Sequence, residues 1–460
     1  MDSIRTLIII SGIFLSSVSY AQASQPSGQR EGSVAQPRLI TIPEGIRLVI
    51  RDSRLLTIAI ADKDMSFADS LMARSALLPH VNASANESFL KFSPGAKSGS
   101  ARFSTAEQQS FSYGFDVYQT LYDFGKSLSH YKAAQELHSA QMVNTDRVKK
   151  IAVLEFVVAY FDVLEAEAMI QVVQKEEESL KAYLHDVKLL YAQGAAIKND
   201  LLPAQVKLAD AAQKLIVARN LRQTLVAKLN NIMALPIHGK IEVQDIKMEI
   251  ASVPELAEAW NIAQVQRPEL AIIADQLKAS ALSEKAKQAD RYPTLYAQGG
   301  YAYSQNQYQV HQDNMNLNLG ATMDVFDGGL TQAEVFKERS RSRGLLAQQD
   351  KLAEDIKLEI EDSYLGFKDA GQKVAVAQDA LAQAAENVRV TRVKYAQGEA
   401  TSTEVLEAIA LQTNAQTNHY SATYELKRNY AKLMYSMGID LALIYDTIHA
   451  YADAAQKQKN

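Results

Sequence analysis

Apolar and polar residues alternate one by one in four stretches of the chain, which form two pairs. The first pair falls within about 77–122 and the second within about 293–326, and polar loops at 93–108 and 305–313 bridge them. A period of two is typical of a β-strand, including strands that face lipid on one side and water on the other. Any single stretch also fits an ordinary strand with one solvated face, but two mirrored pairs favour membrane strands.

A long helical pattern follows each strand pair. Neither proline nor glycine occurs between Lys126 and Gln193, and no proline occurs after Pro293. Periodic segments of this length are typical of a coiled coil, a membrane span or a helical repeat. Charged residues recur every few positions, which excludes the span. We therefore predict coiled-coil helices at about 126–235 and 330–438, in which each breaker-free segment extends roughly 100 Å at about 1.5 Å per residue.

The two halves of the chain resemble each other. The motif Tyr-Ala-Gln-Gly at 191–194 returns at 395–398, and in each half an aspartate (Asp123 or Asp327) stands 68 residues before the motif's tyrosine. Matched motifs at equal spacing indicate a duplicated unit. The sequence therefore predicts two internal structural repeats.

The N-terminus has the pattern of a secretory signal peptide at 1–23. Arg5 supplies a positive start, residues 7–18 are mostly apolar, and Ala21-Gln22-Ala23 is a cleavage pattern. A weak amphipathic anchor is the alternative interpretation. Cleavage would leave a mature chain outside the cytoplasm, with a first repeat at 24–236 and a second at 237–460.

Composition narrows the possible functions. The formal net charge of −5 argues against a nucleic-acid partner, which would need a basic patch. There is no cysteine, so neither a disulfide nor a lipid-bearing cysteine is expected. The eight histidines have no metal-ligand spacing, and no phosphate-binding loop, dinucleotide fingerprint or nucleophile elbow occurs. We expect no catalytic residues, no cofactor and no metal, and therefore not an enzyme.

Four strands are too few to close a barrel, and an open sheet edge is not viable in lipid. Several chains would have to share one barrel, and three would supply twelve strands, within the known size range. The predicted fold class is mainly α with a membrane β-barrel. It combines four strands per protomer, a trimeric twelve-stranded barrel and a long α-helical coiled-coil barrel.

Two further interpretations remain at this point. One is a structural coiled-coil protein of the cell envelope without a pore, and the other is a helical pore-forming toxin. Mirrored strand pairs have no purpose in a scaffold, and a helical toxin would carry an apolar hairpin, which the sequence lacks.

The ordered and duplicated motifs resemble the TolC-like outer-membrane efflux family over nearly all of the mature chain. The residues that carry the resemblance are Leu78-Pro79, Tyr292-Pro293, Leu121-Tyr122-Asp123, Val325-Phe326-Asp327, Arg267-Pro268-Glu269-Leu270 and the two Tyr-Ala-Gln-Gly motifs. The resemblance implies a homotrimer in outer-membrane lipid with a large periplasmic portion. It also implies an equatorial layer, formed by the linker near 237–260 and the C-terminal tail.

The resemblance further implies a passive exit duct for drug efflux or type I secretion. Such ducts work with a periplasmic adaptor protein and an inner-membrane ABC or proton-driven transporter. Within the family, the tips of the helical hairpins dock the adaptor, which here points to Gly194, Ala195, Gly398 and Glu399. Glycine suits the end of any helix, so the two glycines also have a purely structural explanation. The sequence does not indicate the cargo.

A periplasmic gate is the other site that the resemblance implies. Asp200 and Tyr395 match gate residues of the family, but Ala400 stands where the family has an arginine, so a different lock, for example through Lys198, or a looser entrance is expected. Asp200 is also expected to be a helix N-cap, with Pro203 in the first turn.

Glu404 and Glu407 match acidic positions that line the family's entrance. They stand three residues apart, so they share one helix face. In a trimer they would form negative rings that prefer cations. Thr401 and Glu404 also form the pattern of a capping box, which by itself explains Glu404.

Overall fold

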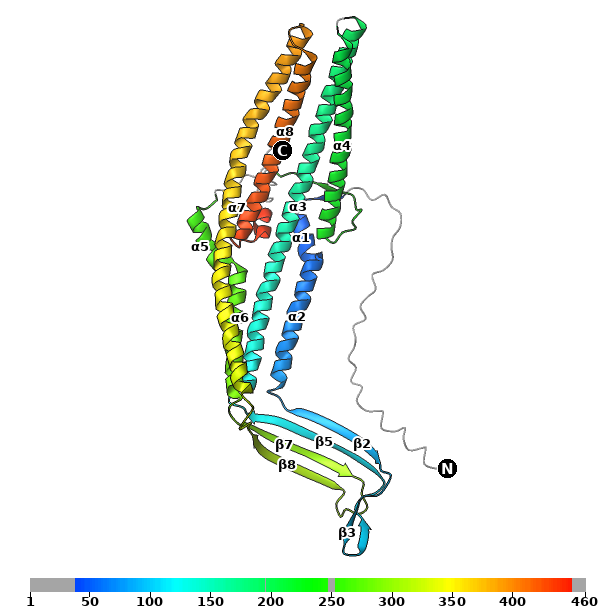
Figure 1. Cartoon of the computed structure of the whole chain (residues 1–460), viewed down its shortest axis with the longest axis vertical. Coiled ribbons are helices and arrows are strands. Elements are labelled where there is room, and N and C mark those ends of the chain that lie inside the picture. The colour runs from blue at the N-terminus through cyan, green and yellow to red at the C-terminus, as the bar shows by residue number, and fades with distance from the viewer. Residues whose placement is uncertain (1–37, 195, 247–252, 449–460) are drawn as a thin grey trace, which may run out of the picture.

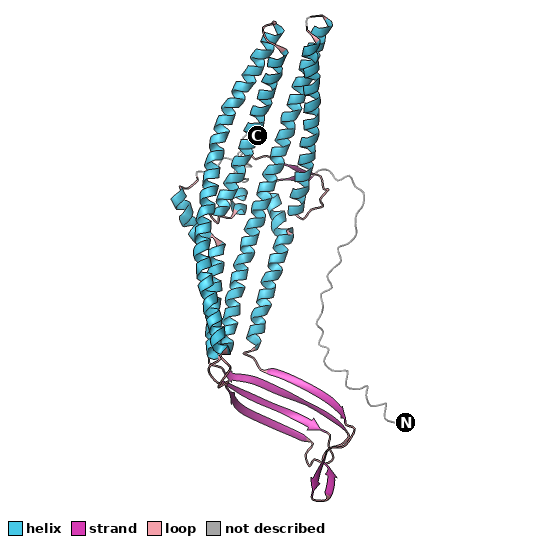
Figure 2. Cartoon of the chain, viewed as in Figure 1, coloured by secondary structure: helices cyan, strands magenta, loops and turns pink. Residues whose placement is uncertain are grey.

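The computed structural model describes residues 38–194, 196–246 and 253–448, so the predicted signal peptide at 1–23 lies outside the described residues. The chain is mainly helical, with long helices at one end and a small sheet at the other (Figures 1 and 2). None of the described helices carries an apolar stretch long enough to cross a bilayer.

The two halves run through the same order of long elements. The first half contains β1 (Arg38–Ile40), α1 (Ile42–Asp52), α2 (Arg54–Ser75), β2 (His80–Phe89), β3 (Gly95–Ser98), β4 (Ala101–Ser104), β5 (Gln109–Tyr122), α3 (Lys126–Ala192) and α4 (Lys198–Ile232). The second half contains β6 (Ile241–Val243), α5 (Leu256–Gln266), α6 (Pro268–Ala289), β7 (Thr294–Ser304), β8 (Asp313–Thr322), α7 (Leu330–Ala396) and α8 (Ser402–Ser436). Helices α3 and α7 each have 67 residues, and α4 and α8 each have 35.

Four strands form one antiparallel sheet in the order β2-β5-β7-β8. Residues directly opposite each other in an antiparallel pair lie on the same face. The register places Phe115 between Ala83 and Tyr301, and it places Asp116 between Asn82 and Gly300. One face of the sheet is therefore apolar and the other is polar. Side chains of the edge strands β2 and β8 are exposed on both faces, and many of those on β5 and β7 are half-buried.

Two details of the predicted strands were wrong. The loop at 93–108 contains the short hairpin β3–β4, and β8 ends at Thr322, so Met323 and Val325 lie outside it despite their alternation. The last pair of the β7–β8 ladder is Thr294 with Thr322. The residue before Thr294 is Pro293, which has no N–H to extend the ladder.

Aspartates start both long helices. Asp123 accepts hydrogen bonds from the backbone N–H of Gly125 and Ser127, and Asp327 accepts them from Gly329 and Thr331, over 2.7–3.1 Å. The hydrogen bonds from Thr331 and Gly329 lower the pKa of Asp327 to about 2. A carboxylate at this place satisfies helix N–H groups that otherwise have no partner.

The largest core lies halfway along the helices, where α1 and the parallel pair β1–β6 pack on α3 (Figure 1). Phe156 and Tyr160 of α3 are fully buried there. The Tyr160 hydroxyl lies 2.9 Å from the Ile40 carbonyl oxygen and accepts the Gln244 N–H at 2.9 Å. The linker after α4 contributes β6 to this level, and the residues after α8 contribute the buried side chain of Tyr445.

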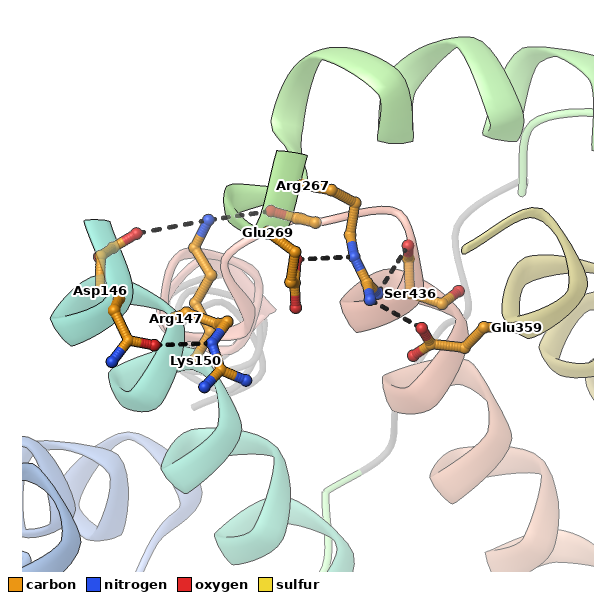
Figure 3. Close-up of polar contacts among 9 residues, drawn as sticks. Asp146, Arg147, Lys150, Arg267, Glu269, Glu359 and Ser436 are labelled. Atoms are coloured by element: carbon orange, nitrogen blue, oxygen red, sulfur yellow. Dashed lines mark hydrogen bonds and ion pairs between the residues drawn. The ribbon is translucent and has the colours of Figure 1, made fainter. Parts of the chain in front are cut away.

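A buried arginine connects the second half to the same level. The side chain of Arg267, at the α5–α6 junction, binds Glu359 of α7 at 2.7 Å, Glu269 at 3.0 Å and the Ser436 carbonyl at the end of α8 at 3.2 Å (Figure 3). Gly438 follows α8 with a φ of +82°, and a Cβ there would lie 2.7 Å from the Gln266 backbone. The Arg-Pro-Glu-Leu motif therefore ties three helices together.

The close approach of α1 to α3 gives a test of this core. A Cβ on Gly45 would lie 2.0 Å from the Phe156 ring. We expect Gly45→Ala to destabilise the protein by about 1–3 kcal/mol, as overpacking does, and to lower the melting temperature in detergent. Gly371→Ala is the control, because nothing lies within 4 Å of a Cβ there. Equal melting temperatures for the two variants would contradict the packing.

Candidate functional site

Two helical hairpins end side by side at the end of the molecule opposite the sheet (Figure 1). Helices α3 and α4 form one hairpin, and α7 and α8 form the other. The hairpins touch through contacts of α8 with α3 and α4. The described residues among those predicted for docking and gating lie in these turns and in the adjoining ends of α4, α7 and α8.

The two predicted docking tips are the turns of the hairpins. Gly194 and Gly398 have φ values of +72° and +78°, and their N–H groups donate to Tyr191 and Tyr395 carbonyls at 3.1 Å. The left-handed conformation is why glycine ends both helices, since the space around each Cα is open. Gly194, Gly398 and Glu399 are exposed, whereas Ala195 lies outside the described residues.

Helix α8 starts with a capping box. The Thr401 hydroxyl accepts the Glu404 N–H at 3.3 Å, and the Glu404 carboxylate accepts the Thr401 N–H at 3.2 Å. This reciprocal pair satisfies two N–H groups of the helix start. The structural explanation of Glu404 is therefore confirmed, and it leaves the side chain exposed.

The prediction that Asp200 is an N-cap was wrong. The N-cap of α4 is Ile197, and Asp200 is the third helical residue, so Pro203 lies beyond the first turn. The Asp200 carboxylate accepts the Ile197 N–H at 3.2 Å, as Glu404 does at the other tip. Isoleucine cannot return the bond, because its side chain has no acceptor. The first tip thus has half of the capping box that the second tip has in full.

A buried polar contact joins the two hairpins beneath the tips. The Tyr183 hydroxyl of α3 donates to the Ser402 hydroxyl of α8 at 2.6 Å, and Ser402 in turn donates to the Asp200 carbonyl at 3.4 Å. Burial raises the pKa of Tyr183, which keeps its hydroxyl neutral and able to donate. The Tyr395 ring packs against Tyr183, with 5.5 Å between ring centroids.

The structure therefore brings the predicted gate residues Asp200 and Tyr395 into one layer. They meet through Tyr183 and Ser402, and no hydrogen bond joins them directly within the described residues. An apolar cluster lies below this layer and includes Leu180, Leu184, Val187, Val405 and Ile409.

The two predicted acidic residues point away from this cluster. Val405 and Ile409 are buried, whereas Glu404 and Glu407 on the same helix are exposed. Glu407 has no ion-pair partner in the described part of the chain, and the same holds for the exposed Lys198. The tip therefore presents two carboxylates on one face of α8.

Sequence reasoning missed Tyr183 and Ser402. At the repeat distance of 204 residues, Tyr183 corresponds to Asn387 and Ser402 to Lys198. The contact thus lies where the two halves differ, and because they differ at most other positions too, that difference alone does not single it out. Among the described residues, no group of acidic or histidine side chains is placed to hold a metal ion.

Comparison with known proteins identifies the family. Residues 46–235 and 260–439 match the family described as outer membrane efflux protein. The chain belongs to the outer membrane efflux protein family. Its fold is shared with solved structures of outer-membrane channels.

Three relatives illustrate the similarity. Outer membrane protein TolC of Vibrio cholerae serotype O1 is 23% identical over 403 residues, which cover 84% of this chain and 88% of the relative. Proteases secretion protein PrtF of Dickeya chrysanthemi is 19% identical over 292 residues, which cover 61% of this chain and 62% of the relative. The crystal structure of the Campylobacter jejuni CmeC outer membrane channel superposes with a TM-score of 0.77 at 16% identity, covering 86% of this chain and 85% of that one.

The contact between the hairpins can be tested by removing one hydroxyl. Ser402→Ala leaves the buried Tyr183 hydroxyl without its shortest hydrogen bond, at a cost of about 1–3 kcal/mol. We expect roughly tenfold faster amide hydrogen exchange in the first turns of α4 and α8, with exchange near Phe156 unchanged. Thr403→Ala is the matched control, because Thr403 is exposed. Identical exchange in both variants would show that the contact does not hold the tips together.

Proposed function

We propose that the chain is one protomer of a trimeric outer-membrane exit duct that passively conducts substrate received from an inner-membrane transporter through a periplasmic adaptor. The observation that carries this proposal is the four-stranded sheet. Strands β2 and β8 stand at its edges, and each has a single partner within the described residues. Unpaired edges and an exposed apolar face together call for other copies of the chain and for lipid.

The alternation of faces supports the membrane part of the proposal. On the apolar face, Val81, Leu317 and Leu319 are at least 70% exposed. On the polar face, asparagine, serine and glycine recur in register across all four strands. A twelve-stranded barrel made from three such sheets would turn the first face to lipid and the second to an aqueous lumen.

The helices support the same assembly. Helices α2 and α7 form the two margins of the helical array, since α2 contacts α3 and α7 contacts α6 and α8. Both margins expose large apolar side chains, namely Ile58, Met65 and Met72 on α2 and Phe336, Leu358 and Val376 on α7. Exposed apolar surface of this kind marks an interaction site, and joining α2 of one copy to α7 of the next would close a ring.

The tips support the docking part of the proposal. Gly194, Ala195, Gly398 and Glu399 would contact the adaptor, and Asp200, Tyr395, Glu404 and Glu407 would form the entrance. The family description refers to efflux, and the name of PrtF refers to secretion of proteases, so the duct would serve efflux or protein secretion. An ABC or proton-driven transporter would supply the energy.

The assembly is tested by the mass of the particle. We expect the purified mature protein to require detergent and to have three times the mass of one chain by light scattering. A monomer that stays soluble without detergent would contradict the duct, because its apolar sheet face and open strand edges would then have no partner.

The acidic entrance is tested by ion selectivity. In a trimer, Glu404 and Glu407 would place six carboxylates around one constriction, which favours cations. We expect Glu404→Gln with Glu407→Gln to reduce the cation preference measured from reversal potentials in planar bilayers. Glutamine keeps an acceptor for the Thr401 N–H, so the cap should persist.

The matched control keeps the charge. Glu404→Asp with Glu407→Asp should leave the selectivity close to that of the unaltered protein. If the glutamine variant also retained full cation preference, the acidic ring would be ruled out, while the duct itself would not be.

A further inference from the structure

The segment between β2 and β5 has an unusual charge. Residues 88–106 contain three cations, Lys91, Lys97 and Arg102, and no acidic residue, although the whole chain is net negative. This segment forms the β3–β4 hairpin, which projects beyond the end of the four-stranded sheet (Figures 1 and 2). The corresponding turn between β7 and β8, residues 305–312, carries no Lys, Arg, Asp or Glu.

Two of the cations face each other. Lys97 of β3 stands directly opposite Arg102 of β4, so both side chains lie on one face of the hairpin. Like charges in this position destabilise a strand pair. Neither residue has a carboxylate within 4.0 Å in the described part of the chain. The hairpin thus holds together two positive charges that its own residues do not neutralise.

The other face of the hairpin is apolar. Ala96 stands opposite Phe103, and the Phe103 side chain is 52% exposed. Phe89 and Phe92 nearby are even more exposed, and the Lys91 ammonium lies 5.4 Å from the centre of the Phe92 ring. Phenylalanine rings on one face with lysine and arginine on the other are typical of segments that lie at the boundary between a bilayer and water.

The base of the hairpin is held in place. The Asn306 side chain donates to the Thr105 carbonyl at 3.1 Å, and the Gln307 N–H donates to the Glu107 carboxylate at 2.9 Å. Asn306 is 7% exposed, so the first bond is shielded from water. Glu107 is the nearest acid after Arg102 in the sequence, and it is engaged in this contact.

We propose that the β3–β4 hairpin binds the phosphate groups of lipid headgroups in the leaflet around the outer end of the sheet. Phe103 would face the acyl chains, and Lys97 and Arg102 would face the phosphates, with the guanidinium suited to two-point binding. The proposal rests on the proposed function, because it needs the sheet to lie in the outer membrane. Phosphate neutralises the cation pair, which explains why the chain tolerates it.

The experiment compares lipids that differ only in phosphate. The full mature protein in detergent is titrated with lipid A carrying two phosphates and with dephosphorylated lipid A, and bound lipid is counted by native mass spectrometry. We expect tighter binding of the phosphorylated form. Lys97→Gln with Arg102→Gln should weaken it by about tenfold or more, since each cation near anionic headgroups contributes measurably. Lys207→Gln with Arg219→Gln is the matched control, because both residues are exposed and belong to α4, which lies away from the sheet (Figure 1).

Each outcome decides the inference. Equal binding of both lipids, or equal loss in the control variant, would overturn it. Displacement of lipid A by inorganic phosphate at the lipid's own concentration would assign the site to free phosphate and also overturn it. The same spectra give the mass of the particle. Absence of a trimer would contradict the proposed function, whereas an intact trimer of the unaltered protein without lipid adducts would contradict only the headgroup site.

Discussion

Helix α3 is the element on which the other parts of the molecule depend. It contacts α1, α2, α4, α6 and α8, and it has no proline or glycine along its 67 residues. Three contacts at successive levels locate other elements along it. The Phe156 ring packs against α1, and the Tyr160 hydroxyl is hydrogen-bonded to the linker after α4. The Tyr183 hydroxyl is hydrogen-bonded to the start of α8. Because an unbroken helix is stiff, these contacts hold their partners at fixed distances from one another.

Helix α7 has the same length and a different environment. Twenty side chains of α3 are buried, whereas only six of α7 are buried. The difference follows from position, since α3 lies between other helices and α7 lies at the margin of the array. Apolar residues such as Leu358 and Val376 therefore remain exposed in a single chain. In the proposed trimer, a neighbouring copy would cover this exposed apolar surface of α7.

Local signals in the sequence predict much of this structure. Alternating residues predict the four strands, and Gly194 and Gly398 predict the ends of α3 and α7, because both signals act over a few residues. The β3–β4 hairpin was missed because its strands are short and contain few apolar residues. Strand β3 also begins with a glycine and directly follows a proline. Asp200 was misplaced because aspartate is favoured at the N-cap and at the third helical position, and only the extended backbone of Ile197 distinguishes the two.

The candidate site was less predictable for a different reason. Its central contact, between Tyr183 and Ser402, joins residues 219 positions apart. Neither residue has an equivalent in the other half, so no internal comparison marks them as conserved within the repeat. The need for glycine at position 45 was likewise not visible in the sequence, because it arises from the close approach of the Phe156 ring on another helix. Contacts of this kind depend on how helices pack, which periodicity alone does not specify.

The aspartates at the strand ends have a consequence for chain length. Asp123 and Asp327 start two helices of identical length at the same edge of the sheet, so residue number along each helix measures height above that edge. One added residue between Tyr160 and Tyr183 would turn everything beyond it by about 100° and lift it by about 1.5 Å. Ser402 would then face the wrong side of α3. Insertions and deletions are therefore tolerated freely only in the turns. Within α3 and α7 they must occur in both halves and must add whole helical turns, so that each side chain keeps its direction.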